Sequence, residues 1–231
     1  GFSEYVRVPE LNVDRGTFLL PENVSYEEGT FIEPIACVVR GQRAAQLSAG
    51  QSILILGSGI SGLLHLLAAK ASGAGIIVMT DINEYRLKLA QELGADAVIS
   101  AGEDVPALLR EANGGRLADL VIVAAGAQAA FGQALKSVDR AGTILCFAPT
   151  EPGKTLAVPV NEFWRNQIKI IHSYGSSPYD NSVALELLKA KRIRIDRMIT
   201  HRFGLSEIGK GFRLFAQGKD CIKVIIEPNK H

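Results

Sequence analysis

The strongest constraint on the fold is a short apolar run that leads into three closely spaced glycines. Ile53 to Leu56 are four consecutive apolar residues, which is typical of a strand buried on both faces of a parallel sheet. The glycines follow as Gly57-x-Gly59-x-x-Gly62, and an apolar helical run begins at once. This order predicts a strand, a tight turn and a helix, which is how a dinucleotide-binding βαβ unit begins.

Each glycine has a separate physical role in such a turn. Gly57 permits the tight turn, Gly59 lets the backbone approach a pyrophosphate, and Gly62 lets the helix pack closely on the strand. The phosphates would accept hydrogen bonds from free N–H groups at the start of the helix, where the dipole favours negative charge. Alone, a glycine triplet is weak evidence, because many such matches are ordinary tight turns.

A second apolar run and an acid supply the context. Ile76 to Thr80 predicts a second strand, and Asp81 follows it about 20 residues after the last glycine. A carboxylate at this point accepts hydrogen bonds from both adenosine ribose hydroxyls and repels a 2′-phosphate, which favours NAD over NADP. Arg86 could instead accept that phosphate, or it could be a solvated helix residue that stacks on the adenine.

From residue 52 to residue 174 the sequence alternates apolar runs with amphipathic segments. The six predicted strands are residues 53–56, 76–80, 97–99, 120–123, 142–147 and 168–172. Strands that alternate with helices imply right-handed crossovers and a parallel, doubly wound sheet. We therefore predict an α/β Rossmann fold with strand order 3-2-1-4-5-6 and a ligand at the carboxyl ends of the strands.

Three loops beyond the reversal of strand order are candidates for the nicotinamide half of the site, although each could be an ordinary turn of small residues. Lys223, on the last predicted strand, could reach the pyrophosphate as a point charge or could face solvent. The predicted cofactor site comprises Gly57, Ser58, Gly59, Ile60, Ser61, Gly62, Asp81, Ile82, Arg86, Ala125, Gly126, Phe147, Ala148, Ser173, Tyr174 and Lys223.

The composition is that of an ordinary globular protein and excludes several classes of partner. Hydrophobic residues make up 47% and charged residues 21%, and the net charge is +1 without a charged block, so nothing indicates nucleic acid or a membrane. Cys37, Cys146 and Cys221 are far apart and form no paired zinc motif, which suggests reduced thiols in a cytoplasm.

Outside the Rossmann pattern the sequence is less informative. Residues 2–8 look like a strand, and because no starting Met precedes them we expect the sequence to enter partway through a longer protein. A helix is expected over residues 26–46, interrupted near Pro34. Glu33 lies beside that proline among apolar residues, and it could be a functional acid or a surface acid. His65 is expected in the core, and His172 is expected to be inert.

Several segments together carry a resemblance to a known family. They are Gly1–Val6, Phe31–Pro34, Gly57–Gly62, Arg86–Asp96, Gly142–Ile144, Ser173–Gly175 and Ile222–Ile225. In these segments the chain resembles the C-terminal two-thirds of a medium-chain, zinc-dependent alcohol dehydrogenase, and most of all the sorbitol and threonine dehydrogenase branch. The resemblance implies a Rossmann domain over residues 35–190, with remnants of a GroES-like catalytic domain at residues 1–34 and 191–231.

The resemblance also implies roles for single residues. Glu33 falls where the family has the third ligand, or near-ligand, of its catalytic zinc, and Lys223 falls where a basic residue meets the pyrophosphate. The backbone around Phe147, Ala148 and Tyr174 would hold the nicotinamide carboxamide. The family's zinc polarises the alcohol oxygen, and a hydride passes to the nicotinamide. Because the other zinc ligands are absent, we expect no catalytic residue and no tightly bound zinc in this sequence as given.

Two classes of function follow. The first is a zinc- and NAD-dependent oxidoreductase that transfers a hydride from a secondary alcohol of a polyol, sugar or amino-alcohol to NAD, present here as its cofactor-binding portion. The second is a non-enzymatic NAD-binding module; a methyltransferase is disfavoured by Asp81.

Residues 155–160 are expected to be an edge strand, since Pro159 cannot donate a ladder hydrogen bond. In the family this segment pairs with its two-fold mate, so we expect a homodimer or homotetramer.

Overall fold

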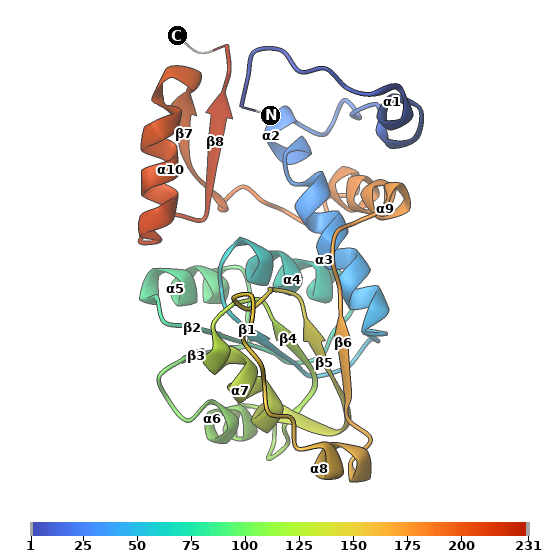
Figure 1. Cartoon of the computed structure of the whole chain (residues 1–231), viewed down its shortest axis with the longest axis vertical. Helices are drawn as coiled ribbons and strands as arrows, with labels where there is room; N and C mark the ends of the chain where they lie inside the picture. Colours follow the sequence, from blue (N-terminus) through green and yellow to red (C-terminus); the bar gives the residue numbers. More distant parts are fainter. Residues whose placement is uncertain (1, 230–231) are drawn as a thin grey trace. The chain divides into compact units, whose positions relative to one another are not determined.

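In the computed structural model, which describes residues 2–229, the six apolar runs form one parallel sheet (Figure 1). The strands are β1 (Ile53–Leu56), β2 (Ile77–Asp81), β3 (Ala97–Ser100), β4 (Ala118–Val123), β5 (Val138–Cys146) and β6 (Lys169–His172). Their order is β3-β2-β1-β4-β5-β6. The predicted Rossmann order is therefore confirmed. Gly1, Lys230 and His231 lie outside the described residues.

Helices cover both faces of this sheet. They are α4 (Ile60–Ala71), α5 (Glu84–Glu92), α6 (Val105–Ala112) and α7 (Gln128–Ser137), with the short α8 (Val160–Arg165) before β6. Figure 1 shows α4 and α5 on one side of the sheet and α6 and α7 on the other. Asn83 caps α5 through the N–H of Arg86, and Asp104 caps α6 through the N–H of Ala107. These caps fix where each crossover helix begins.

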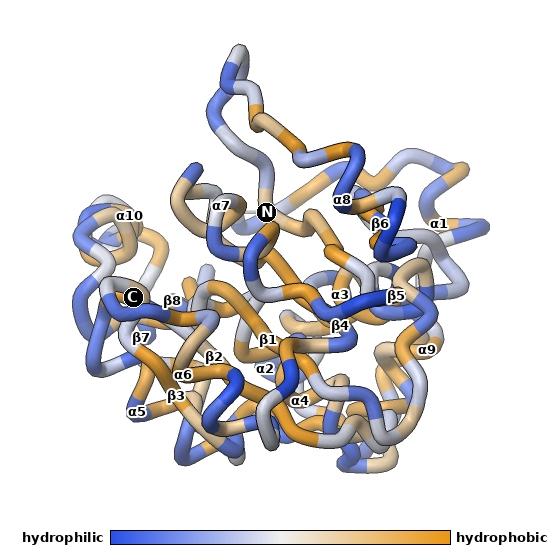
Figure 2. Tube along the Cα trace, turned by 90° about the horizontal axis from the view of Figure 1, so that it is seen from below, coloured by the Kyte–Doolittle hydropathy of each residue, from blue (hydrophilic) through white to orange (hydrophobic). Residues whose placement is uncertain are grey.

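The core follows from this double cover. All four residues of β1 are fully buried, and the tube along β1 is hydrophobic throughout (Figure 2). Leu54 and Leu56 belong to a cluster with Val121, Val105 and Phe131 from β4, α6 and α7. Burial of one such side chain contributes about 1.5–3 kcal/mol. The apolar run Ile53–Leu56 thus forms a central strand of the sheet.

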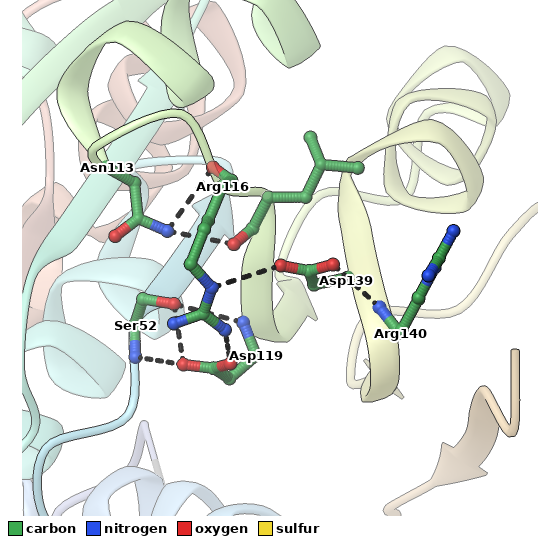
Figure 3. A network of polar contacts seen from close by, with 7 residues as sticks. Ser52, Asn113, Arg116, Asp119, Asp139 and Arg140 are labelled. Carbon is green, nitrogen blue, oxygen red and sulfur yellow. Dashed lines mark hydrogen bonds and ion pairs between the residues drawn. The ribbon is translucent and has the colours of Figure 1, made fainter.

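A polar network closes the edge of the sheet where β1 and β4 begin (Figure 3). The N–H and the hydroxyl of Ser52 both donate to Oδ2 of Asp119, at 2.9 and 2.7 Å. Arg116 pairs with Asp119 and, at 3.3 Å, with Asp139. Burial acts to raise the pKa of the Asp119 carboxyl, but hydrogen bonds from Ser52 and Arg116 outweigh it and hold the pKa below its usual value.

Replacing Asp119 with alanine is expected to destabilise the protein by about 1–3 kcal/mol, because the buried N–H of Ser52 loses its acceptor. Asp139→Ala is a matched control that removes only an exposed ion pair and a local contact, and should cost less than about 1 kcal/mol. Since folding lowers the pKa of Asp119, its contribution is present above the unfolded pKa of about 4 and is lost as pH falls below it. Thermal unfolding at pH 7 and pH 3 measures both effects. If the two variants lost the same stability at pH 7, the stabilising role of the bond between Asp119 and Ser52 would be contradicted.

The chain divides into two compact units. The first, here named the sheet unit, is residues 37–176, and it includes the C-terminal part of α3 (Ile32–Ala44). The second, named the flanking unit, combines the segment up to Ala36 with the segment from Ser177. Its elements are α1 (Glu10–Gly16), α2 (Tyr26–Gly29), α9 (Pro178–Lys189), β7 (Ile199–Gly204), the 3-10 turn η1 (Leu205–Glu207), α10 (Ile208–Gln217) and β8 (Lys223–Glu227).

Interactions between distant residues hold the flanking unit together. β7 and β8 form a parallel pair, and α10 packs on both strands through Gly211, whose bare backbone approaches Val224 and Phe203. Ion pairs join Glu27 to Arg202 and Glu28 to Lys191. None of the helices between Phe2 and Asn229 is long and apolar enough to cross a membrane.

Three expectations differ from the structure. Residues 2–9 are irregular rather than a strand, and the predicted helix breaks at Thr30–Phe31 instead of Pro34, since proline is tolerated in a first helical turn. Thr155 to Val158 form an irregular segment rather than a strand. The flanking unit resumes at Ser177, and two hydrogen bonds join its segments: the Asn23 side chain donates to the Lys189 carbonyl, and Lys191 donates to the Asn23 carbonyl. The expected domain boundary at residue 190 stays a prediction.

Candidate functional site

The turn between β1 and α4 has the geometry that its three glycines predict. Gly57 has a φ of +104°, a conformation that strongly favours glycine. A Cβ added at Gly62 would overlap the carbonyl oxygen of Gly57, so only glycine lets α4 approach β1 this closely. Gly62 and Gly57 therefore serve the fold of the turn itself.

Gly59 differs from its neighbours, because its surroundings are open. It has an ordinary φ of −71°, and a Cβ added there would meet nothing closer than Nη1 of Arg86, at 4.0 Å. Gly59 is also the N-cap of α4 and makes no side-chain cap, so the N–H groups of Ile60 and Ser61 begin the helix without intrahelical partners. Open space in front of free N–H groups is what an anion at a helix N-terminus requires.

Asp81 is held at the carboxyl end of β2 by two backbone donors. Its Oδ2 accepts the N–H of Ser58 at 2.7 Å, and its Oδ1 accepts the N–H of Asn83 at 2.9 Å. Asp81 is only 7% exposed, so these bonds fix the carboxylate beside the glycine turn. The hydroxyl of Ser58 is buried and donates to the Thr80 carbonyl, so its side chain belongs to the fold, whereas Ile82 is 88% exposed.

Arg86 approaches the same turn from the first part of α5. Within residues 2–229 its Nε is buried and has no hydrogen-bond partner. A buried donor without an acceptor costs about 1–3 kcal/mol, and a bound ligand can remove that cost. An arginine beside open space therefore fits an anionic or hydroxyl-rich ligand.

The loops after β4, β5 and β6 lie at the same edge of the sheet. A Cβ at Gly57 would be 2.9 Å from Cβ of Ala125, and one at Gly126 would be 2.6 Å from the Pro149 carbonyl oxygen. The N–H groups of Phe147 and Ala148 both donate to the Val123 carbonyl, so the loop after β5 is held to the end of β4.

The loop after β6 offers a second unsatisfied group. Among the described residues the Ser173 hydroxyl is buried without a partner, while Tyr174 is 97% exposed. Contacts thus join the glycine turn to Asp81, Arg86 and Ala125, and the loops after β5 and β6 follow neighbouring strands at the same edge of the sheet. An open phosphate cradle, a fixed carboxylate and two unsatisfied polar groups fit a dinucleotide.

Lys223 and Glu33 belong to the flanking unit and have surroundings of their own. Nζ of Lys223 donates to the Thr30 carbonyl at 2.9 Å and lies 4.2 Å from the centre of the Phe31 ring. Burial lowers the pKa of Lys223, and the charge of Glu33 opposes that shift. The predicted contact of Lys223 with a pyrophosphate stays a prediction, and its bond to Thr30 has no signature in the sequence.

The described part of the chain does not provide a zinc site. No group of three or more His, Cys, Asp or Glu in residues 2–229 could hold a metal ion. A catalytic zinc normally takes three protein ligands, so the described residues do not fit a catalytic zinc. Glu33 as a zinc ligand therefore stays a prediction.

His65 is fully buried in α4, as the sequence predicted. Burial lowers the pKa of its imidazole to about 3, so the ring is neutral. Its hydrogen-bond partner, Gln42 in α3, carried no signal in the sequence, because the two residues come together only when α3 packs beside α4.

Comparisons with known proteins agree with this geometry. The sequence profile of the zinc-binding dehydrogenase family matches residues 61–190. Sorbitol dehydrogenase from Arabidopsis thaliana is 33% identical over 90% of this chain and 58% of its own length. D-arabitol-phosphate dehydrogenase from Enterococcus avium is 34% identical over 91% of this chain and 60% of its own length.

A solved structure extends the match to three dimensions. A protein from Sinorhizobium meliloti, described as a zinc-binding dehydrogenase and bound to NADP, is 25% identical with a TM-score of 0.83, over 91% of this chain and 62% of its own. The chain therefore spans about three-fifths of the length of the proteins it matches. Since the family profile covers more than half of the sequence and the fold agrees, this chain belongs to the zinc-binding dehydrogenase family.

Proposed function

We propose that the sheet unit binds NAD in preference to NADP, and that the chain is the cofactor-binding portion of a zinc-dependent dehydrogenase. The reaction would transfer a hydride from a secondary alcohol of a polyol, sugar or amino-alcohol to NAD, which supplies the hydride acceptor. Support for this substrate class comes from relatives named sorbitol and arabitol-phosphate dehydrogenases. None of the cysteines in the described residues forms a disulfide, which accords with a reducing cytoplasm.

The observation that carries the proposal is the open space at Gly59, bounded by Asp81 and Arg86. A pyrophosphate there would accept hydrogen bonds from the first N–H groups of α4. The Asp81 carboxylate would then face the adenosine ribose. Each of its oxygens accepts one backbone N–H and has a second lone pair that can accept a hydrogen bond from a ribose hydroxyl. The loops after β4 to β6 would receive the nicotinamide half.

The preference for NAD should be visible as an affinity ratio. A negative charge at Asp81 repels a 2′-phosphate, so the protein is expected to bind NADH about 10-fold more tightly than NADPH, or better. Asp81→Asn keeps the side-chain shape and one acceptor for the backbone, and should narrow the ratio. Asp81→Ala should narrow it too, but it also leaves the N–H of Ser58 without an acceptor and should lower stability.

Titration of both reduced cofactors into parent and Asp81→Asn protein measures this ratio, with thermal unfolding as the control for fold. Equal affinities in the parent would refute the preference for NAD. A ratio that Asp81→Asn leaves unchanged would show that some other residue sets it.

We also propose that two copies of the chain associate through residues 155–159. In this irregular segment Leu156 and Val158 pack on the core of the sheet unit, while Ala157 and Pro159 face outward. Gln128 holds the segment through the Thr155 carbonyl, at 3.2 Å. Exposed apolar residues in this segment offer a surface to which a second chain can bind.

A cysteine at Ala157 is therefore expected to cross-link to its copy under oxidation. Ala157 is a better position than Val158, whose side chain turns toward the core. The parent protein, with its three native cysteines, is the control for background cross-linking. A monomeric mass at micromolar concentration, together with no cross-link above background, would contradict association through this segment.

A further inference from the structure

The buried His65 has an unusual hydrogen-bonding state. Nε2 of Gln42 lies 2.8 Å from the carbonyl oxygen of His65 and 3.3 Å from its Nδ1. An amide nitrogen can only donate, so Nδ1 accepts and the proton of the neutral ring lies on Nε2. That Nε2–H is buried and finds no hydrogen-bond acceptor in residues 2–229. A leucine would fill such a place without leaving a donor unpaired, so the imidazole calls for another explanation.

The ring of Phe147 is the neighbour that gives one. The two rings are perpendicular, with an interplanar angle of 88° and centres 4.5 Å apart. Aromatic rings prefer this edge-to-face arrangement because it is electrostatically favourable, and an N–H directed at a ring face adds a weak attraction. The contact is therefore directional, whereas an aliphatic neighbour would let the phenyl ring turn.

Phe147 is also confined from α3. A Cβ added at Gly41 would lie 3.3 Å from Cδ2 of Phe147 and 3.3 Å from Cδ2 of Leu145, so the backbone of α3 closes on the ring. Gln42, the next residue, holds His65. Phe147 is thus fixed between α3 and α4 directly after β5, at the start of the loop whose Pro149 carbonyl approaches Gly126.

We propose that His65 is a positioning residue, which fixes the Phe147 ring and thereby the loop that receives the nicotinamide half of the cofactor. This inference rests on the proposed function and adds a residue to that site. His65 lies one helical turn after Ser61, so the helix that begins at the phosphates reaches the nicotinamide loop through its second turn. The adenosine half of the site, at Gly59 and Asp81, does not involve the Phe147 ring.

The test compares two ligands that differ in the nicotinamide. NADH occupies the whole site, whereas ADP-ribose occupies only the pyrophosphate and adenosine half. His65→Leu is expected to weaken NADH binding by roughly ten-fold while changing ADP-ribose binding by less than about two-fold. His65→Phe keeps an aromatic ring against Phe147 and should recover most of the NADH affinity. Phe147→Leu should reproduce the selective loss, and the double variant with His65→Leu should lose less than the two single losses combined.

Leu109→Ala is the matched control for stability, because Leu109 is a fully buried residue of α6 in the core cluster around Val105. Leu109→Ala should lower the melting temperature and should change the affinities for NADH and ADP-ribose by the same factor. Equal weakening of both ligands by His65→Leu, or no weakening of either, would overturn the positioning role. A parent protein that binds neither ligand would overturn the proposed function, and the inference with it.

Discussion

Replacing Gly59 with valine is expected to abolish NAD binding while leaving the protein folded. The side chain would enter the open space in front of α4 and exclude the pyrophosphate from the first N–H groups of the helix. Loss of two charge-assisted hydrogen bonds, at about 1.5–3 kcal/mol each, corresponds to a loss of about 100-fold or more in affinity. The fold should tolerate the change, since Gly59 has an ordinary φ and the one atom near its Cβ position is the mobile end of Arg86.

Gly132→Val is the matched control. Gly132 in α7 also has nothing within 4 Å of its Cβ position, but it lies outside the predicted cofactor site. NADH titration and thermal unfolding of parent, Gly59→Val and Gly132→Val proteins separate binding from folding. Parent-like binding by a folded Gly59→Val protein would show that the pyrophosphate lies elsewhere.

Replacing Gly62 with alanine, by contrast, should strongly destabilise the sheet unit. A single methyl group at Gly62 would overlap the Gly57 carbonyl, which belongs to backbone and cannot rotate away. Relief requires α4 to move off β1, where all four strand residues are fully buried. We expect a destabilisation of at least about 3 kcal/mol, a large fraction of the 5–15 kcal/mol that stabilises a typical domain.

Chemical denaturation measures this cost, and Gly132→Ala is its control. Alanine in the interior of α7 should stabilise the protein by about 0.5–1 kcal/mol, because it reduces the freedom of the unfolded chain. Gly59→Ala should be close to neutral. If Gly62→Ala and Gly59→Ala proved equally stable, α4 would not be as close to β1 as the structure has it.

The sheet could be predicted from the sequence because its strands are buried on both faces. Such strands read as continuous apolar runs, and Ile53–Leu56 and Leu120–Val123 are visible without any knowledge of their neighbours. The glycine turn could also be predicted from the sequence, because the steric reason for each glycine is local. The strand order then followed from the doubly wound Rossmann pattern that the glycine turn and the alternation of strands and helices indicate.

Features that depend on distant contacts could not be predicted. Residues 2–8 have strand-like apolar positions. Tyr5 and Val6 remain exposed, however, so in the described residues no burial stabilises a strand there. The two segments of the flanking unit are joined by bonds of Asn23 with Lys189 and Lys191, which are far from it in sequence. No local sequence pattern predicts such contacts.

The site shows the same division between local and distant information. Asp81 was predicted from its spacing to the glycines, but its bonds to the N–H groups of Ser58 and Asn83 were not. Those bonds close the turn, and we propose that the same carboxylate also faces a ribose. Gln42 and His65 meet only through packing of α3 beside α4, so a positioning role for His65 has no signature in the sequence.

A titration of the protein with NADH, followed by displacement with ADP-ribose, tests the site at the turn between β1 and α4. We expect saturable binding at one site per chain, full displacement by ADP-ribose and no measurable binding by Gly59→Val. A folded parent protein without saturable binding, or binding that ADP-ribose leaves intact, would contradict the claim that the turn between β1 and α4 is a dinucleotide site.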